Sequence, residues 1–497
     1  MKPSPLIVRT ALRTFLFPLT TLAFLSGCAT PPTATDQATV NAWTQLGPNG
    51  NSSLRALVAG AAPCPVAQID GTPRPMARRA DANPAAGRQD NPAFNPPFEV
   101  ASCELTLPAG TASALIDGRS IPLPKTDTRR IVVLGDTGCR IKVPADGKAD
   151  PIQDCANPDA WPWQKIAAAA ARTQPDLVIH VGDYHYREYC DDPERCAPLV
   201  AKGLVVSYGW TGWDADFFSP ARPLLAAAPW VFVRGNHENC DRSGEGWMRF
   251  LSPLPYLACG DQRYKSASRS VLANNDTADA YRIELDSELG LIVADNAGHE
   301  DYRKASETPQ DVALFRRTLA TLHDAPRAQQ LWLFSHRPLW YDLLGAAVQP
   351  NALQAVLHNT LPANVQLAFA GHQHAFETLN FAPDADRDHH PAGRPAQVIV
   401  GGGGSQLEAL DPQSPLYESE REQGSGPGSK ERAQHGERLY EGVAASSGIL
   451  LNRYSFLLLE RDAEGWAGTV LDVDGRPLSH CRLSGGKKEL ACSFPAG

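Results

Sequence analysis

From residue 129 onward, short continuous apolar runs alternate with longer amphipathic stretches. The apolar runs are typical of strands buried on both faces, and they lie at 131–134, 177–181, 230–233, 291–294, 331–334, 365–369 and 398–400. Helical spacing occurs between them at 163–173, 308–322 and 349–359. This order predicts an α/β fold. Two later runs, 454–460 and 468–473, predict closing antiparallel strands, because an Asp-Gly turn signal follows the second.

The first 28 residues have the pattern of an export signal. Three basic residues precede an apolar run at 15–25, which is too short to span a bilayer. The run ends in Leu-Ser-Gly-Cys, which resembles the lipobox of bacterial lipoproteins. We therefore expect removal of residues 1–27, lipidation of Cys28, and attachment to the outer membrane, facing the periplasm or the cell surface. An ordinary secretory signal is the alternative.

Composition excludes some classes of function. The 497 residues are 43% hydrophobic and 20% charged, as in folded proteins. The net charge is −9, and it becomes −12 when three basic side chains leave with the signal peptide. No basic stripe accompanies it, so no nucleic-acid partner is indicated.

Cysteine usage fits an oxidising compartment. Of 11 cysteines, ten remain apart from Cys28, an even number that would allow five disulfides. Local spacing suggests the pairs Cys190–Cys196, Cys240–Cys259, Cys481–Cys492, and more weakly Cys139–Cys155 and Cys64–Cys103, although spacing alone does not fix connectivity.

The chain divides into segments of different composition. Residues 28–125 are expected to form a tether, over 31–50, and a small loop-rich β region that contains a low-complexity stretch at 73–97. Residues 126–478 form the predicted catalytic domain, with a disordered surface insertion at 408–442. Residues 479–497 form a disulfide-bearing tail.

Five short blocks at the ends of predicted strands concentrate residues that coordinate metals. In chain order they contain Asp136; Asp183 and Tyr186; Asn236 and His237; His336; and His372 and His374. Because ligands gather outside the carboxyl ends of strands in open α/β sheets, these blocks are able to converge.

The blocks resemble those of the calcineurin-like metallophosphoesterase superfamily. That resemblance implies a layered fold, a β-sandwich flanked by helices. Gly138 stands where most of the superfamily has a histidine, and Tyr186 instead gives the G-D-x-x-Y pattern, which resembles the purple acid phosphatase branch. In that branch the tyrosine binds ferric iron.

The resemblance implies a site with two metal ions. Asp136, Tyr186 and His374 would bind one ion, Asn236, His336 and His372 the other, and Asp183 would bridge them. Hard oxygen donors suit Fe³⁺, and the imidazole-rich set suits Zn²⁺, Mn²⁺ or Fe²⁺. Two such ions would hold a hydroxide that attacks a phosphoryl group clamped between them.

Five further residues receive supporting roles. His237 would act as general acid or as a donor to the phosphate. Arg337 would partly replace the histidines that purple acid phosphatases carry shortly after the strand-end histidine. Glu238 would orient a ligand or His237, and His185 and Arg242 are candidates for the same surrounding shell or for substrate contact.

Three functions therefore remain open. The first is hydrolysis of phosphate monoesters, with a small phosphate ester as the only partner apart from the membrane that holds the lipid anchor. The second is phosphodiester hydrolysis at the same site. The third is a non-catalytic envelope lipoprotein that uses the fold to bind a metal or a partner. The sequence leaves the oligomeric state open.

Overall fold

A computed structural model describes residues 39–83, 96–141, 153–187, 193–259, 277–299, 305–340, 352–357, 360–381, 393–407, 429–431 and 447–495. The compact unit to which they belong spans residues 38–497. Cys28 and the predicted signal peptide lie outside the described residues.

The larger of the three described sheets has 11 strands. In spatial order they are β23 (Leu490–Ser493), β22 (Pro477–Ser484), β21 (Gly465–Asp472), β20 (Ser455–Asp462), β9 (Arg130–Leu134), β10 (Leu177–His180), β11 (Trp230–Phe232), β1 (Thr39–Leu46), β2 (Ser52–Ala59), β6 (Val100–Thr106) and β5 (Ala77–Ala80). The four central strands β9, β10, β11 and β1 are parallel, and antiparallel strands extend the sheet on both sides.

A second sheet has eight strands. Their order is β12 (Tyr281–Glu284), β13 (Leu289–Val293), β14 (Gln330–Phe334), β15 (Val365–Ala370), β17 (Ala396–Val400), β16 (Phe376–Leu379), β19 (Ile449–Leu451) and β18 (Ser429–Glu431). Strands β13, β14, β15 and β17 are parallel. A small sheet contains β4 (Thr72–Pro75), β3 (Val66–Ile69), β7 (Ala114–Ile116) and β8 (Arg119–Ser120).

The two large sheets pack face to face. Alternate residues of the central strands, such as Ile131 and Val231, share one buried cluster with Trp332, Phe334 and Phe369 of the second sheet. The rings of Phe334 and Phe369 stack with centroids 4.6 Å apart. This cluster is the core of a β-sandwich. Because each sheet is also covered on its other face, its central strands are apolar on both faces and appear in the sequence as continuous apolar runs.

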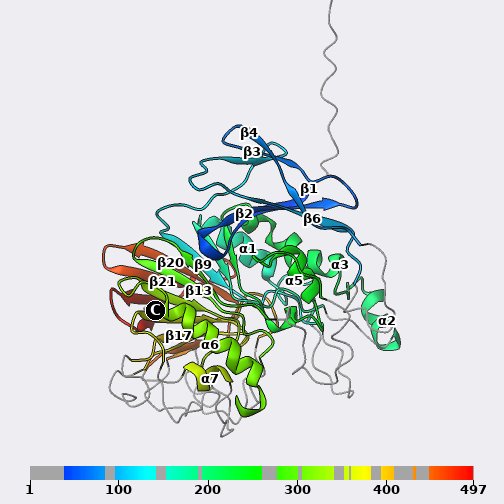
Figure 1. Ribbon diagram of the computed structural model, residues 1–497. Helices are drawn as coiled ribbons and strands as arrows, with labels where there is room; N and C mark the ends of the chain where they lie inside the picture. Colours follow the sequence, from blue (N-terminus) through cyan, green and yellow to red (C-terminus); the bar gives the residue numbers. More distant parts are fainter. Residues whose placement is uncertain are drawn as a thin grey trace, which may run out of the picture. The chain divides into compact units, whose positions relative to one another are not determined.

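Helices cover the outer faces, as Figure 1 shows. Against the larger sheet pack α1 (Trp163–Arg172), α3 (Trp210–Trp213), the π-helical turn η3 (Asp214–Phe218), α4 (Ser219–Leu225) and α5 (Gly244–Phe250). Against the second sheet pack α6 (Pro309–His323) and α7 (Ala352–Leu357). The remaining short elements are α2 (Pro193–Ala201), η1 (Pro48–Gly50), η4 (Asn236–Glu238) and η7 (Ala305–Glu307). The predicted layered fold, with its sandwich and flanking helices, is confirmed.

The N-terminal part differs from the expectation. Residues 39–46, predicted as part of a flexible tether, form β1 and pair with β11 at Gln45–Trp230. A buried indole explains the difference, because Trp43 is fully buried and packs against Phe218, with the ring centroids 5.5 Å apart. The N-terminal strands thus extend the sheet that carries β9, β10 and β11.

Four of the five predicted disulfides are present, namely Cys64–Cys103, Cys139–Cys155, Cys240–Cys259 and Cys481–Cys492. The fifth involves Cys190, which lies outside the described residues. Residues 477–493 form a hairpin of β22 and β23 at the edge of the larger sheet. Of the predicted insertion at 408–442, only residues 429–431 are described, as β18.

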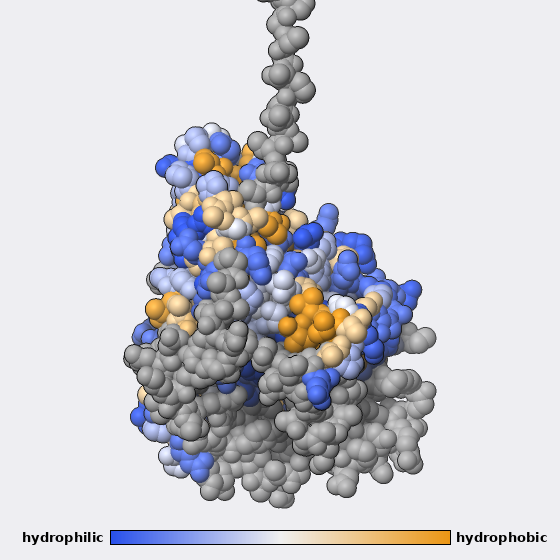
Figure 2. All heavy atoms as spheres, turned by 90° about the vertical axis from the view of Figure 1, so that its right-hand side faces the viewer, coloured by the Kyte–Doolittle hydropathy of each residue, from blue (hydrophilic) through white to orange (hydrophobic). Residues whose placement is uncertain are grey.

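The described surface is mainly polar. Figure 2 shows hydrophilic side chains over most of it on one side, with apolar side chains in small areas. The exposed large apolar residues among those described are Val66, Leu115, Val200 and Leu257. In the described part of the chain, no helix has the length and apolar character needed to cross a membrane.

Candidate metal centre

The five predicted blocks meet at one edge of the sandwich, where parallel strands of both sheets end. From the larger sheet come Asp136 after β9, Asp183 and Tyr186 after β10, and Asn236 after β11. From the second sheet come His336 after β14, and His372 and His374 after β15. The five blocks thus converge as predicted, because side chains from the larger sheet lie within hydrogen-bond distance of side chains from the second sheet.

The backbone is strained at three of these residues. Asp136, Asp183 and His372 have φ values of 57°, 59° and 71°, in a region that residues other than glycine rarely adopt. Gly182, before Asp183, has φ of 102°, and a Cβ there would lie 2.8 Å from Cγ of His336. Such conformations persist where the surrounding structure enforces them, and they gather at functional sites.

The first group of side chains meets at the hydroxyl of Tyr186. Its Oη lies 2.7 Å from Asp183 Oδ2, 2.7 Å from His374 Nε2 and 3.1 Å from Asp136 Oδ1. The tyrosine is 2% exposed and Asp136 is fully buried. Three acceptor atoms thus surround a hydroxyl that has one proton to donate.

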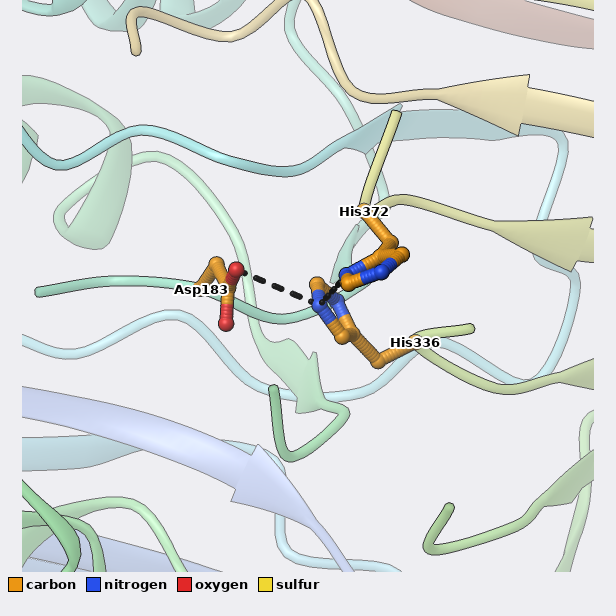
Figure 3. A group of neighbouring side chains, drawn as sticks. All are labelled: Asp183, His336 and His372. Carbon is orange, nitrogen blue, oxygen red and sulfur yellow. Dashed lines mark hydrogen bonds and ion pairs between the residues drawn. The ribbon is translucent and has the colours of Figure 1, made fainter. Parts of the chain in front are cut away.

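The second group meets at Nε2 of His336. This atom lies 3.0 Å from Asn236 Oδ1, 3.2 Å from Asp183 Oδ2 and 3.2 Å from His372 Nδ1. Figure 3 shows Asp183, His336 and His372 pointing toward one another, and their ligand atoms lie within 4.8 Å of each other. Oδ2 of Asp183 therefore contacts both groups.

Hydrogen bonds on the far side of two histidine rings fix which nitrogen faces the site. Nδ1 of His336 lies 2.9 Å from the carbonyl of Val181, and Nδ1 of His374 lies 2.6 Å from the carbonyl of Gln406. A carbonyl only accepts, so each Nδ1 donates, and each Nε2 of the neutral ring presents a lone pair. Histidines that bind metals are oriented in this way.

These lone pairs fit cations better than they fit one another. Around His336 Nε2, a carboxylate oxygen and an amide oxygen approach a nitrogen lone pair. Around Tyr186, a single hydroxyl proton faces three acceptor atoms. Two carboxylates, a phenol, an amide oxygen and three imidazoles are together a donor set for a pair of metal ions, with the hard oxygens concentrated on the Tyr186 side.

Burial and neighbouring charges shift the pKa values of the side chains in this site. Burial, together with the charge of Asp183, raises the pKa of Asp136. Burial alone would raise the pKa of Asp183 too, but His336 and His237 outweigh it and hold that pKa well below its usual value. Burial lowers the pKa of His237 to about 3, against the opposing charge of Asp183. Positive charge at this site would stabilise both carboxylates as anions.

His237 is partly exposed and lies beside Asp183 and Tyr186. Its side chain is 14% exposed, and its Nε2 is 3.9 Å from Asp183 Oδ2. The centroid of its ring lies 3.8 Å from that of the Tyr186 ring. Arg242 contacts the same ring, with Nη2 2.8 Å from Nδ1. Arg337 contacts a different residue, with Nη1 3.1 Å from His372 Nε2, and it is 7% exposed. Arg242, which follows a strand of the larger sheet, and Arg337, which follows a strand of the second sheet, thus contact two different histidines of the site.

Glu238 supports the loop that carries Asp183. It is fully buried, and its carboxyl oxygens accept hydrogen bonds from the backbone N–H groups of Asp183, Tyr184, His185 and Gly235, at 3.0–3.2 Å. It is thus placed to orient Asp183, a predicted ligand, through the main chain of its loop.

The expectation for His185 needs correction. Its ring is 1% exposed, faces the carbonyl of Ser207 at 2.7 Å, and packs against Tyr208 and Trp213. These contacts place the ring in the packing beneath the site. Its side chain is placed for neither substrate nor ligand contact.

Sequence reasoning missed Asn296 and Arg140. Asn296 follows β13, and its Oδ1 accepts the N–H groups of His336 and Arg337 at 3.1 and 3.0 Å. Its position after a strand, like that of the five blocks, was the available signal. The positive charge of Arg140 acts on both Tyr186 and His237, but nothing in the sequence indicated that it would lie near them.

Comparison with known proteins identifies the domain. Residues 129–376 match the family of calcineurin-like phosphoesterases. A purple acid phosphatase from yellow lupin (Lupinus luteus) seeds has a similar fold, with a TM-score of 0.50 and 16% identity, covering 89% of this chain and 73% of that one.

Two curated proteins match at lower coverage. One is named probable inactive purple acid phosphatase 24, from Arabidopsis thaliana, with 22% identity over 58% of this chain and 44% of that protein. The other is a nucleotide pyrophosphatase/phosphodiesterase from Hordeum vulgare, with 22% identity over 56% of this chain and 71% of that protein. This chain thus spans less than half the length of the Arabidopsis relative. Residues 129–376 of the chain belong to the calcineurin-like phosphoesterase family, and the structure shares its fold with the lupin purple acid phosphatase.

Proposed function

We propose that the protein hydrolyses phosphate monoesters with two metal ions held by the seven converging side chains. The observation that carries the proposal is the position of the Tyr186 hydroxyl, within 3.1 Å of Asp136, Asp183 and His374. A tyrosine placed among two carboxylates and an imidazole is a donor set for Fe³⁺. The ligands around His336 suit Zn²⁺, Mn²⁺ or Fe²⁺.

When bound, the two ions supply the nucleophile by lowering the pKa of a water molecule, and they stabilise charge on the phosphoryl oxygens. The chain's own residues have separate tasks. Asp183 holds both halves of the site at a fixed separation. His237 is partly exposed and Arg242 contacts its ring, so they are placed to donate hydrogen bonds to phosphoryl or leaving-group oxygens. Arg337 orients His372.

The test is metal analysis with a visible absorption spectrum, on protein purified without chelator. We expect about two metal ions per chain, one of them iron, and a visible band that is absent from the Tyr186→Phe variant. Two divalent ions without the band would retain the hydrolase and refute the iron assignment. Wild-type protein that binds no metal and cleaves 4-nitrophenyl phosphate no faster than the Asp183→Asn control would refute the proposal. That result would favour a non-catalytic lipoprotein.

Phosphodiester hydrolysis is the second candidate. It is favoured by the printed name of the Hordeum vulgare relative, a nucleotide pyrophosphatase/phosphodiesterase. Rates on 4-nitrophenyl phosphate and bis(4-nitrophenyl) phosphate separate the two candidates. A higher kcat/KM on the monoester supports the first, and a higher value on the diester supports the second.

We also propose that the protein is anchored to the outer membrane through lipid on Cys28. The proposal rests on the residues Leu-Ser-Gly-Cys after the apolar run. Detergent extraction of cell envelopes tests it, because wild type is expected in the detergent phase and Cys28→Ala in the aqueous phase. Equal partition of the two forms would contradict the anchor.

A further inference from the structure

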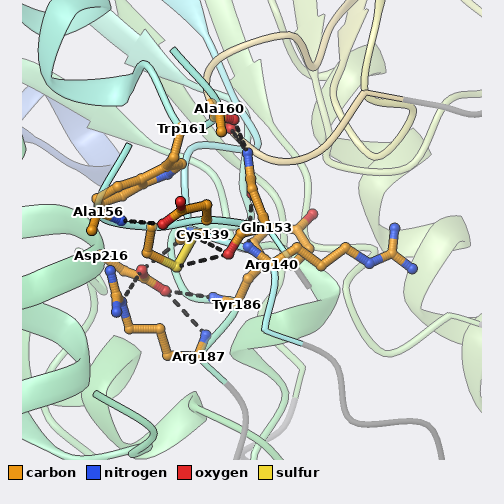
Figure 4. Close-up of a disulfide and its surroundings, with 12 residues drawn as sticks. Cys139, Arg140, Gln153, Ala156, Ala160, Trp161, Tyr186, Arg187 and Asp216 are labelled. Carbon is orange, nitrogen blue, oxygen red and sulfur yellow. Dashed lines mark hydrogen bonds and ion pairs between the residues drawn. A yellow bond between two sulfur atoms is a disulfide. The ribbon is translucent and has the colours of Figure 1, made fainter. Parts of the chain in front are cut away.

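Asp216 is a buried carboxylate that the proposed reaction does not use. It lies in the π-helical turn η3, is 0% exposed, and receives four hydrogen bonds. Three come from backbone N–H groups, those of Cys139, Tyr186 and Arg187, at 3.1, 2.8 and 3.1 Å. The fourth comes from Nε of Arg187 at 2.5 Å. Figure 4 shows the carboxylate between these segments. Single-turn π-helices often occur at functional sites.

The two segments that Asp216 joins carry two predicted ligands of the same ion. Cys139 comes three residues after Asp136, and its N–H donates to Oδ1. Tyr186 donates its own N–H to Oδ2. The side chains of Asp136 and Tyr186 meet at 3.1 Å. One rigid carboxylate therefore sets the distance between the two segments, and none of its four hydrogen bonds comes from Asn236, His336 or His372.

Other contacts brace the same two segments. The Cys139–Cys155 disulfide closes a loop directly after Gly138. The N–H of Ile141 donates to the carbonyl of Tyr186 at 3.3 Å. The guanidinium of Arg187 lies 5.3 Å from the ring centroid of Trp161, whose Nε1 donates to the carbonyl of Thr137 at 2.9 Å. Asp216 is the centre of this arrangement, because it also balances the buried charge of Arg187.

We propose that Asp216 is a positioning residue that fixes the ion bound by Asp136, Tyr186 and His374, and leaves the other ion unaffected. This inference rests on the proposed two-metal function. Replacement by asparagine keeps the size of the side chain but supplies one acceptor oxygen in place of two. At least one of the joined segments then loses its anchor, and Arg187 loses its counter-charge. Mutation of a residue that hydrogen-bonds to a metal ligand typically lowers metal affinity by about 10–100-fold.

The experiment titrates metal-free protein with Zn²⁺ in competition with a chelating indicator, for wild type and Asp216→Asn. Wild type is expected to bind two ions. In Asp216→Asn, the Zn²⁺ affinity of one of the two binding steps should fall by roughly 10–100-fold, and the affinity of the other should stay within about threefold of the wild-type value. Raising Zn²⁺ in the assay should then restore hydrolysis, which a general loss of structure would not allow.

Glu245→Gln is the matched control. Glu245 is also a buried carboxylate, and it accepts hydrogen bonds from Arg249, from Tyr256 and from the N–H of a disulfide cysteine, Cys259, at 2.7–2.8 Å. It resembles Asp216 in chemistry, but none of these three hydrogen bonds comes from a predicted metal ligand. Its replacement should lower the melting temperature and leave both Zn²⁺ steps unchanged.

Three results would overturn the inference: both steps unchanged in Asp216→Asn, both weakened equally, or the same selective loss in Glu245→Gln. If Asp216→Asn does not fold, the paired replacement of Cys139 and Cys155 by alanine decides, because it loosens the same segment while keeping the ion pair. Selective weakening of one step supports the inference, and two unchanged steps refute it. A wild type that binds no Zn²⁺ and cleaves no phosphate ester would instead refute the proposed function.

Discussion

Glu238→Gln tests how the protein holds the loop of the bridging aspartate. Oε1 of Glu238 accepts the N–H groups of Tyr184 and His185, and Oε2 accepts those of Asp183 and Gly235. Glutamine keeps one of the two oxygens, and its NH₂ group faces two N–H donors. Two buried donors then lose their acceptor.

The expected cost follows from that count. A buried donor without a partner costs about 1–3 kcal/mol, so Glu238→Gln should lower the free energy of unfolding of the metal-free protein by about 2–6 kcal/mol. In the metal-loaded protein, affinity for the ions should also fall, by about 10–100-fold, because Asp183 is no longer held at its strained φ of 59°.

Urea unfolding of metal-free protein measures the first effect and chelator competition the second. Glu460→Gln is the control, because Glu460 pairs with Arg130 at 2.8 Å with side chains 44% and 37% exposed. An exposed pair of this kind contributes about 0–1 kcal/mol. A loss below about 1 kcal/mol for Glu238→Gln, equal to that of the control, would refute the view that this carboxyl group supports the loop.

Three further predictions concern other parts of the molecule. Despite some desolvation, hydrogen bonds from Lys125 and from the backbone at 129 and 130 lower the pKa of Asp176, so its contribution to stability is present above the unfolded pKa of about 3.9 and disappears as the pH falls through the lower pKa of the folded state. In urea unfolding, the free energy of unfolding of Asp176→Asn should therefore be lower than that of wild type at pH 7, and the difference should be smaller at pH 3. The same difference at both pH values would contradict the assignment. Replacing Cys481 and Cys492 by alanine opens a loop with a separation of 11 residues and should cost about 2–3 kcal/mol in the same measurement; no loss in non-reducing buffer would mean that the hairpin of β22 and β23 needs no covalent link. Removal of metal by chelator should lower the melting temperature, since ions at 100 times their Kd stabilise by about 2.7 kcal/mol per site, and readdition should restore it, whereas an unchanged melting temperature would argue against binding in the folded state.

The sequence by itself determined the layered fold and the composition of the candidate site. Buried strands appear as continuous apolar runs, so the positions of β9, β10, β14 and β15 could be predicted within a few residues. The polar block after each strand follows from the same pattern, because the carboxyl ends of parallel strands meet at one edge. Cysteine spacing was informative as well, since three of the four pairs found join residues that are 11 to 19 positions apart, whereas Cys64 and Cys103 are 39 apart.

Tertiary structure alone decided how these residues support one another. Asp216, Asn296 and Glu238 act through backbone N–H groups far away in the sequence, and such contacts leave no periodicity or motif. The direction of the His185 ring follows from its contacts with Ser207, Tyr208 and Trp213, and β1 pairs with β11 where Trp43 is buried. Local patterns report which residues are buried and where strands end, whereas the partner of a buried polar group is set by packing between distant segments.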